Sequence, residues 1–200
     1  MTTDIPTLES PIDVMYLIHK ALRAEAARVE MVVGQLEEGS SLHPFKQAFY
    51  GWVVALGHHA AVEDTCMTAL LPDSPPAREN EAAHRRLEER LEDIQKCLQE
   101  EIGRTLLIAR TQRHLYGSVV RAQIAQDDHL EEEEAFVLPL IRQRLGEAQQ
   151  LEMARRLLLD QDAEDTRWIL DWVAQALTPT EQQWLAGLAA RFSEACPRAG

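Results

Sequence analysis

The sequence has few cysteines, no long apolar run and a shortage of positive charge. Its three cysteines, Cys66, Cys97 and Cys196, are widely spaced and form no CxxC pair, which argues against a disulfide framework or a zinc ribbon. Charged residues interrupt each apolar stretch within about ten residues, whereas a membrane-spanning helix needs about 20. With 33 acidic against 20 basic residues, the formal net charge of -13 argues against nucleic acid and membrane surfaces as partners.

A secretion signal is also missing from the beginning of the sequence. The first residues, MTTDIPTLESPIDVM, contain acids and prolines where a signal peptide has a positive start and an apolar run. Together with the lack of a disulfide pattern, this predicts a cytoplasmic protein. A chain of 200 residues can bury a core without metal or disulfide support, so a metal site here would need a functional or a local electrostatic reason.

Apolar residues recur every three or four positions, and no segment alternates with period two for long, so the predicted fold class is all-α. Four amphipathic patterns follow one another, over about residues 11–34, 45–70, 77–103 and 106–146. Pro11 opens the first pattern as an N1 proline, and the run from Pro72 to Pro76 ends the second. The fourth is long for a globular helix, and Gly117 or the region of Gly103 is where a kink is expected.

The last part of the chain predicts further helices. Residues 151–176 are expected to form a fifth helix, and Thr178, Pro179 and Glu181 then provide an N-cap, an N1 proline and an N3 acid for a sixth. The predicted architecture is an antiparallel up-down four-helix bundle over residues 1–147, with C-terminal helices packed on it over residues 148–200.

Two pairs of residues have the spacing HxxxE, which places one imidazole and one carboxylate on the same face of a helix. In each half of the sequence, a lone histidine in the inward stripe of the preceding helix comes before the pair. If the halves fold antiparallel, four imidazoles and two carboxylates meet at one place in the bundle. These six candidate metal-binding residues are His19, His59, Glu63, His84, His129 and Glu133.

Such a cluster calls for cations. Each buried ionised carboxylate or imidazole costs several kcal/mol unless it is paired, neutral or bound to a metal. Two ions, each with two nitrogens and two oxygens from bridging carboxylates, resolve the problem, and this mixed donor set suits iron or manganese without excluding zinc. Coordination positions remain open on each ion for a bridging oxygen, dioxygen, peroxide or nitric oxide.

The stretches YLIHKAL, GHHAAVED, EAAHRRLEERL and DDHLEEEEAFVLPLI resemble the hemerythrin-like, or HHE cation-binding, family over about residues 12–145. The tail RWILDWVAQALTPTEQQWL is similar to the helix that follows such domains in iron-regulated ubiquitin ligases. In the family, each bundle helix supplies one histidine and the two HxxxE glutamates bridge the irons, so the resemblance implies these roles for the six residues above. It favours an oxo- or hydroxo-bridged pair of iron ions over manganese or zinc.

The resemblance implies a protein that binds or senses dioxygen, nitric oxide, peroxide or iron, and the sequence identifies no protein partner. The alternative is a di-iron oxidase, peroxidase or oxygenase that acts on a small substrate in a pocket beside Tyr16, Trp52 and Met67. Oxygen-carrying hemerythrins have a second histidine one turn after that of the third helix, where this sequence has Glu88. A Glu88 that faces the cluster would be an extra anionic ligand that favours the ferric state. A Glu88 in solvent leaves that position to water.

Several neighbours compete for roles at the cluster. His58 is the rival of His59, but the residue four positions after His58 is the apolar Val62. Glu134, within the run EEEE, is the rival of Glu133. Asp64 is expected either to hold a ligand imidazole from behind or to be exposed. Tyr16, one turn before His19, is expected in the core, with hydrogen bonding to the cluster as the alternative.

Overall fold

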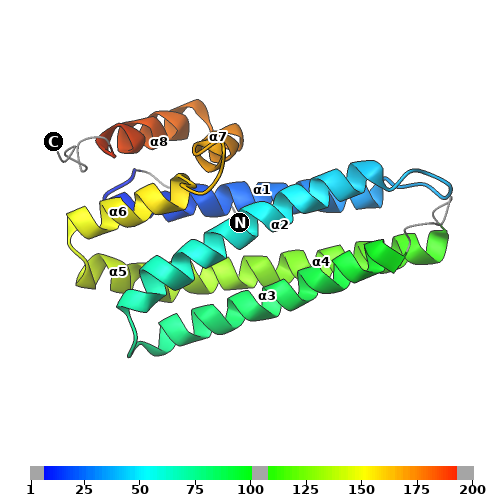
Figure 1. The fold of residues 1–200 in the computed structure, drawn as a ribbon, viewed down its shortest axis with the longest axis horizontal. Coiled ribbons are helices and arrows are strands. Elements are labelled where there is room, and N and C mark those ends of the chain that lie inside the picture. The colour runs from blue at the N-terminus through cyan, green and yellow to red at the C-terminus, as the bar shows by residue number, and fades with distance from the viewer. Residues whose placement is uncertain (1–6, 101–107, 193–200) are drawn as a thin grey trace.

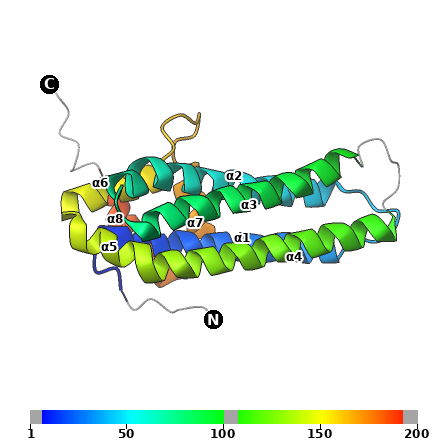
Figure 2. The ribbon, with the colours of Figure 1, turned by 90° about the horizontal axis from the view of Figure 1, so that it is seen from below.

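The computed structural model describes residues 7–100 and 108–192, and every regular element in these ranges is helical. Four long helices, α1 (Val14–Gly34), α2 (His43–Val62), α3 (Pro75–Glu100) and α4 (Ala109–Glu132), form an antiparallel bundle (Figures 1 and 2). Each packs against the next, and α4 packs back against α1. The predicted all-α fold with an antiparallel up-down four-helix bundle is thus confirmed.

The start of α1 is fixed by its N-terminal residues. A 3-10 turn, η1 (Pro11–Asp13), precedes the helix, and its proline occupies N1 as predicted. The Asp13 carboxylate accepts hydrogen bonds from the backbone N–H groups of Glu9 and Ser10 at 2.8 and 2.9 Å. Arg142, which follows the fourth long helix in the sequence, donates to the same carboxylate at 2.8 Å. The chain therefore enters α1 in one orientation, which sets the face on which His19 lies.

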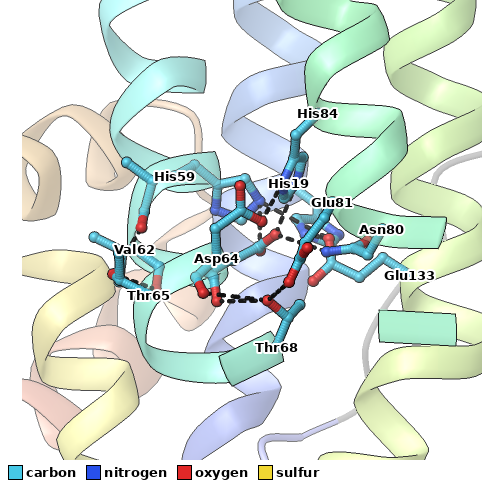
Figure 3. A network of polar contacts seen from close by, with 12 residues as sticks. His19, His59, Val62, Asp64, Thr65, Thr68, Asn80, Glu81, His84 and Glu133 are labelled. Atoms are coloured by element: carbon cyan, nitrogen blue, oxygen red, sulfur yellow. Dashed lines mark hydrogen bonds and ion pairs between the residues drawn. The ribbon is translucent and has the colours of Figure 1, made fainter. Parts of the chain in front are cut away.

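Helices α2 and α4 each continue into a π-helical turn. One is η2 (Glu63–Met67), followed by the 3-10 turn η3 (Thr68–Leu70), and the other is η4 (Glu133–Val137), followed by α5 (Leu138–Arg144). Each π turn begins at the glutamate of an HxxxE pair. A π turn adds a residue to the helical repeat and is frequent at functional sites. The Thr68 hydroxyl donates to Glu81 at 3.0 Å and so ties the end of η2 to α3 (Figure 3).

The helix is not broken at Gly117, which lies inside an uninterrupted α4; the expected long helix is interrupted instead by the π turn η4. The alternative place for it, Gly103, is outside the described residues, as is Cys196.

The prediction of a single helix over residues 151–176 is wrong. Helix α6 (Glu147–Leu158) ends in a loop, and α7 (Trp168–Gln175) begins after it. In the loop, the Asp160 carboxylate accepts from the backbone N–H of Asp162 at 3.1 Å and from Trp168 Nε1 at 3.0 Å. Aspartate side chains that bond to nearby groups in this way compete with helix formation, so this acidic stretch interrupts the helix despite apolar residues on both sides.

The C-terminal helices α7 and α8 (Pro179–Arg191) lie along α1, away from α3 (Figure 1). The predicted start of α8 is present: the Glu181 backbone N–H donates to the Thr178 hydroxyl, and the Glu181 carboxylate accepts from the Thr178 backbone N–H at 2.8 Å. Lys20 of α1 donates to the same carboxylate at 2.7 Å. The cap of α8 thus also attaches it to the helix that carries His19.

This cap leads to a stability prediction. We expect Thr178→Ala to lower the free energy of unfolding by about 1 kcal/mol, because the backbone N–H of Glu181 loses the hydroxyl that accepts its hydrogen bond. For a chain of this length, that corresponds to a fall of about 2–4 °C in Tm. Thermal unfolding followed by circular dichroism measures it, with Thr7→Ala, an exposed threonine before α1, as control. Equal Tm values for the two variants would contradict the assignment.

Candidate metal centre

The six side chains that the sequence singles out meet inside the bundle, and none is more than 7% exposed. They come from each long helix and from the first residue of each π turn: His19, His59, Glu63, His84, His129 and Glu133. Figure 3 shows the heads of the labelled histidines and of Glu133 pointing toward one another from α1, α2, α3 and η4.

The donor atoms form two groups, and within each group they lie within 4.8 Å of one another. The first group contains His19, His59, Glu63 and Glu133, and the second contains Glu63, His84 and His129. Glu63 belongs to both: its Oε1 is 2.8 Å from His59 Nε2, and its Oε2 is 3.1 Å from His84 Nε2. One carboxylate therefore presents an oxygen to each group, as a bridging ligand does.

Glu133 is placed differently from Glu63. Its Oε2 lies 3.4 Å from His19 Nε2 and 4.0 Å from His59 Nε2, so it faces the first group only. The first group accordingly offers four protein donors and the second offers three from histidine and acidic residues.

Most of these donor atoms have no hydrogen-bond partner. Among the described residues, this holds for Nε2 of all four histidines, for Glu63 Oε1 and for both Glu133 oxygens, although all are buried. Two ligands at about 2.1 Å from one ion and at right angles to each other lie about 3 Å apart, close to the spacings seen here. Buried polar atoms left unpaired are costly. The donor set therefore fits two cations that share Glu63.

The outer nitrogens of two histidines are held by acids. His19 Nδ1 donates to Glu134 at 2.7 Å, and His84 Nδ1 donates to Asp64 at 2.8 Å. These bonds fix the tautomer that leaves Nε2 free to bind a metal. Glu134 directly follows Glu133 in the second half of the bundle sequence and holds His19 of the first half. Asp64 directly follows Glu63 in the first half and holds His84 of the second. Arg23 in turn donates to Glu134 at 2.9 Å.

Two histidines of the cluster have raised pKa values, so they tend to be protonated when no metal is bound. Burial opposes the charged form of His19, but the nearby carboxylates of Glu133 and Glu134 outweigh it and raise the pKa of His19 to about 9. Glu63 and Asp64 act on His84 in the same way, again overcoming burial, and its pKa is also about 9.

Burial shifts the other groups of the cluster in the direction of their neutral forms. Burial and the nearby Glu63 charge raise the pKa of Glu133 to about 8. Burial and the positive charge of His84 lower the pKa of His129 to about 3, and burial lowers that of His59. Glu63 is the exception, because the surrounding histidines outweigh its burial and hold its pKa well below the usual value.

Three further candidates lie outside both groups. The Tyr16 hydroxyl accepts from Arg142 at 3.2 Å, and the guanidinium lies 5.5 Å above its ring. His58 packs edge-on against Trp168, with ring centroids 5.8 Å apart. Glu88 is exposed on α3. The structure therefore does not bring Tyr16, His58 or Glu88 to the cluster.

Sequence reasoning missed Asn80, which lies one turn before His84 on α3. Asn80 is only 4% exposed, and its Nδ2 donates to Glu63 Oε2 at 3.4 Å (Figure 3). Its signal in the sequence was the spacing of four residues from a candidate ligand on the same face. That spacing alone is a weak signal, because an amide is a less common metal ligand than an imidazole or a carboxylate.

Two surface cavities extend to the cluster. One, of about 360 Å³ between α2 and α3, is lined by Leu56, Gly57, Asp64, His84 and Glu88, among others. The other, of about 320 Å³, lies between α3 and η4 and is lined by Asn80, His129, Glu133 and Phe136, among others. Trp52 and Met67, expected beside a pocket, are instead fully buried in the core.

Fold and site together define a helical-bundle protein built to bind cations. The family described as Hemerythrin HHE cation binding domain matches residues 10–141, and the chain belongs to this family. No curated protein and no solved structure gives a significant match. Within the described ranges, no helix combines the length and apolar character that a membrane span requires.

Proposed function

We propose that the protein holds a pair of iron ions and binds a small oxidant, dioxygen, nitric oxide or peroxide, as a sensor or iron-responsive module. His19, His59, Glu63 and Glu133 would hold one ion, and Glu63, His84 and His129 the other. The observation that carries the proposal is the convergence of buried donor atoms without hydrogen-bond partners on two points that share Glu63. Iron suits mixed nitrogen and oxygen donors, and manganese or zinc are the competing ions.

The protein's own residues supply the conditions for such binding. Asp64 and Glu134 keep the histidine Nε2 atoms directed inward, and the apolar bundle around them excludes bulk water. The first group offers four donors from histidine and acidic residues and the second offers three, fewer than the six of an octahedral ion, so coordination positions stay open on each ion. When bound, the metal pair would supply redox chemistry and a place for an exogenous oxygen or nitrogen ligand.

Anaerobic purification followed by elemental analysis tests the proposal. We expect two iron ions per chain and a change in the visible spectrum when dioxygen, nitric oxide or peroxide is added. A change that reverses when the ligand is removed supports binding or sensing. A protein that retains no pair of ions, or whose spectrum responds to none of the three, rules the proposal out.

A second candidate function is a di-iron oxidase, peroxidase or oxygenase. The two cavities beside the cluster favour it, because their volumes of about 360 and 320 Å³ exceed what a diatomic gas needs and fall among those of small-molecule sites. Single-turnover reaction of the reduced protein with dioxygen separates the two functions. Irreversible consumption of oxygen that is coupled to oxidation of an added organic substrate indicates an enzyme, whereas reversible uptake indicates a binding protein.

The acids behind the histidines give a further prediction. We expect Asp64→Asn and Glu134→Gln each to weaken metal binding by about 10- to 100-fold, because an amide holds the imidazole less firmly and removes a negative charge. Competition with a chromophoric chelator measures the affinity. Glu132→Gln, the same change at an exposed glutamate on the other side of Glu133, serves as control and should leave affinity unaltered. If all three variants bind as the wild type does, the two acids have no such role.

A further inference from the structure

The two groups of donors are unequal, and the difference lies on the side of α3. Four side chains face the first ion position, whereas only Glu63, His84 and His129 face the second. An iron or manganese ion commonly takes more ligands than three. A further protein donor, of a residue type other than histidine, cysteine and the acids, is therefore expected near the second position.

Asn80 is the residue that the fold places there. It precedes His84 by four positions on α3, so both side chains leave the same face of the helix. Its Nδ2 is 3.4 Å from Glu63 Oε2, and His84 Nε2 is 3.1 Å from the same oxygen. Three polar heads thus converge on one side of the second group, as Figure 3 shows for the labelled Asn80 and His84.

The surroundings of Asn80 are those of a ligand more than of a surface residue. Asn80 is only 4% exposed, and it lines the same cavity as His129 and Glu133. Within the described residues, the long contact with Glu63 is its one hydrogen bond. A carboxamide beside the cluster that makes one long hydrogen bond and faces a cavity has an oxygen that can bind an ion instead.

We propose that Asn80 is a metal-binding residue whose carboxamide oxygen completes the coordination of the ion held by Glu63, His84 and His129. The oxygen and nitrogen of a carboxamide exchange places by a half-turn, which would direct Oδ1 to the ion and Nδ2 to the cavity. A carbonyl oxygen is a neutral donor that suits hard cations. This inference rests on the two-metal centre of the proposed function.

The proposed role also sets the charge of the site. Glu88, one turn from His84 in the other direction, is exposed and belongs to neither group. The donor one turn from His84 is then a neutral amide and not a carboxylate. Among the residues that would bind the second ion directly, Glu63 is then the only anionic one, so this ion is reduced more readily than one with an added anionic ligand.

Metal titration of the metal-free protein tests Asn80 separately from the rest of the centre. Co²⁺ is added anaerobically, and each equivalent is followed by its visible spectrum and by competition with a chelator. In Asn80→Ala and in the similarly sized Asn80→Leu, we expect the first equivalent to bind as in the wild type. The second should bind about 10-fold or more weakly and with an altered spectrum. Glu88→Ala is the control and should match the wild type, and circular dichroism checks the helix content of every variant.

Asn80→Asp identifies the atom involved. An aspartate keeps an oxygen in place, so it should restore tight binding of the second equivalent if Asn80 acts through its oxygen. Loss of affinity in Asn80→Ala without rescue by Asn80→Asp would mean that the amide acts only as a donor to Glu63, which overturns the proposal. Unchanged binding in Asn80→Ala overturns it too. A wild-type protein that binds no second ion instead contradicts the proposed function, so the two failures are distinguishable.

Discussion

Replacing Glu63 with glutamine is expected to remove both metal ions, whereas the same change at Glu133 should leave about one ion per chain. Glu63 is the one residue common to the two groups, with Oε1 toward His59 and Oε2 toward His84. A glutamine has one oxygen and one NH₂ group, so it cannot present an acceptor to each ion, and it also removes the negative charge that offsets two cations. Glu133 faces only the first group, so its loss leaves Glu63, His84 and His129 in place.

The two variants form a matched pair, because both replace a buried carboxylate at the first residue of a π turn. Elemental analysis after reconstitution counts the ions, and circular dichroism confirms that the bundle has folded. A Glu63→Gln protein that keeps an ion while Glu133→Gln keeps none would reverse the roles of the two glutamates. Equal losses in both variants would mean that the ions bind only together.

The long helices of the bundle were predictable because helices that pack side by side have a periodic pattern of apolar residues in the sequence. Each must bury one stripe, so apolar residues recur every three or four positions, and prolines mark the starts of α1, α2 and α3. The same periodicity placed His59 with Glu63 and His129 with Glu133 on inward faces. The histidines of α1 and α3 could be assigned because they lie in the inward stripes.

Features that depend on contacts between helices were harder to predict. The π turn at Glu63 changes the helical repeat without any proline or glycine to announce it, whereas the one at Glu133 is followed by Pro139 at the start of α5. The loop between α6 and α7 also lacks both residues, and its signal was the acidic run that includes Asp160. The positions of Glu88 and Asn80 depend on how α3 is rotated about its axis, which the sequence pattern defines only to within a residue or so.

The second large effect concerns the response of stability to pH. Between about pH 7 and pH 9, we expect the metal-free protein to become less stable as pH rises, while the stabilisation by metal increases. The pKa of His19 and of His84 is about 9 in the fold, above the ordinary 6.5, and that of Glu133 is about 8, above 4.5. A pKa that is higher in the folded state means that folding binds protons, so this stability is fully present below the unfolded pKa and is lost as pH rises through the folded one.

The remaining groups of the cluster do not oppose this trend. Folding lowers the pKa values of His59, His129 and Glu63, so their opposite contribution to stability arises mainly below the ordinary values of 6.5 and 4.5 and is nearly complete at pH 7. Metal ions need the deprotonated donors, so loading the centre at pH 7 should release protons from His84 and from the pair formed by His19 and Glu133. The metal competes with fewer protons at pH 9, and its affinity is therefore higher there.

Thermal unfolding of metal-free and metal-loaded protein at pH 7, 8 and 9 measures both effects. An ion present at about 1,000 times its Kd stabilises the fold by about 4 kcal/mol, which corresponds to about 10 °C in Tm for a chain of this size. The difference in Tm between the two forms should widen with each step in pH, and Glu63→Gln should show no difference at any pH. A metal-free protein whose Tm rises from pH 7 to pH 9 would show that the cluster does not hold these protons. Counting the protons released on metal loading with a pH indicator dye would then separate two explanations. Release of protons means that the donor atoms bind metal although the assigned pKa values are wrong, and no release means that they bind none.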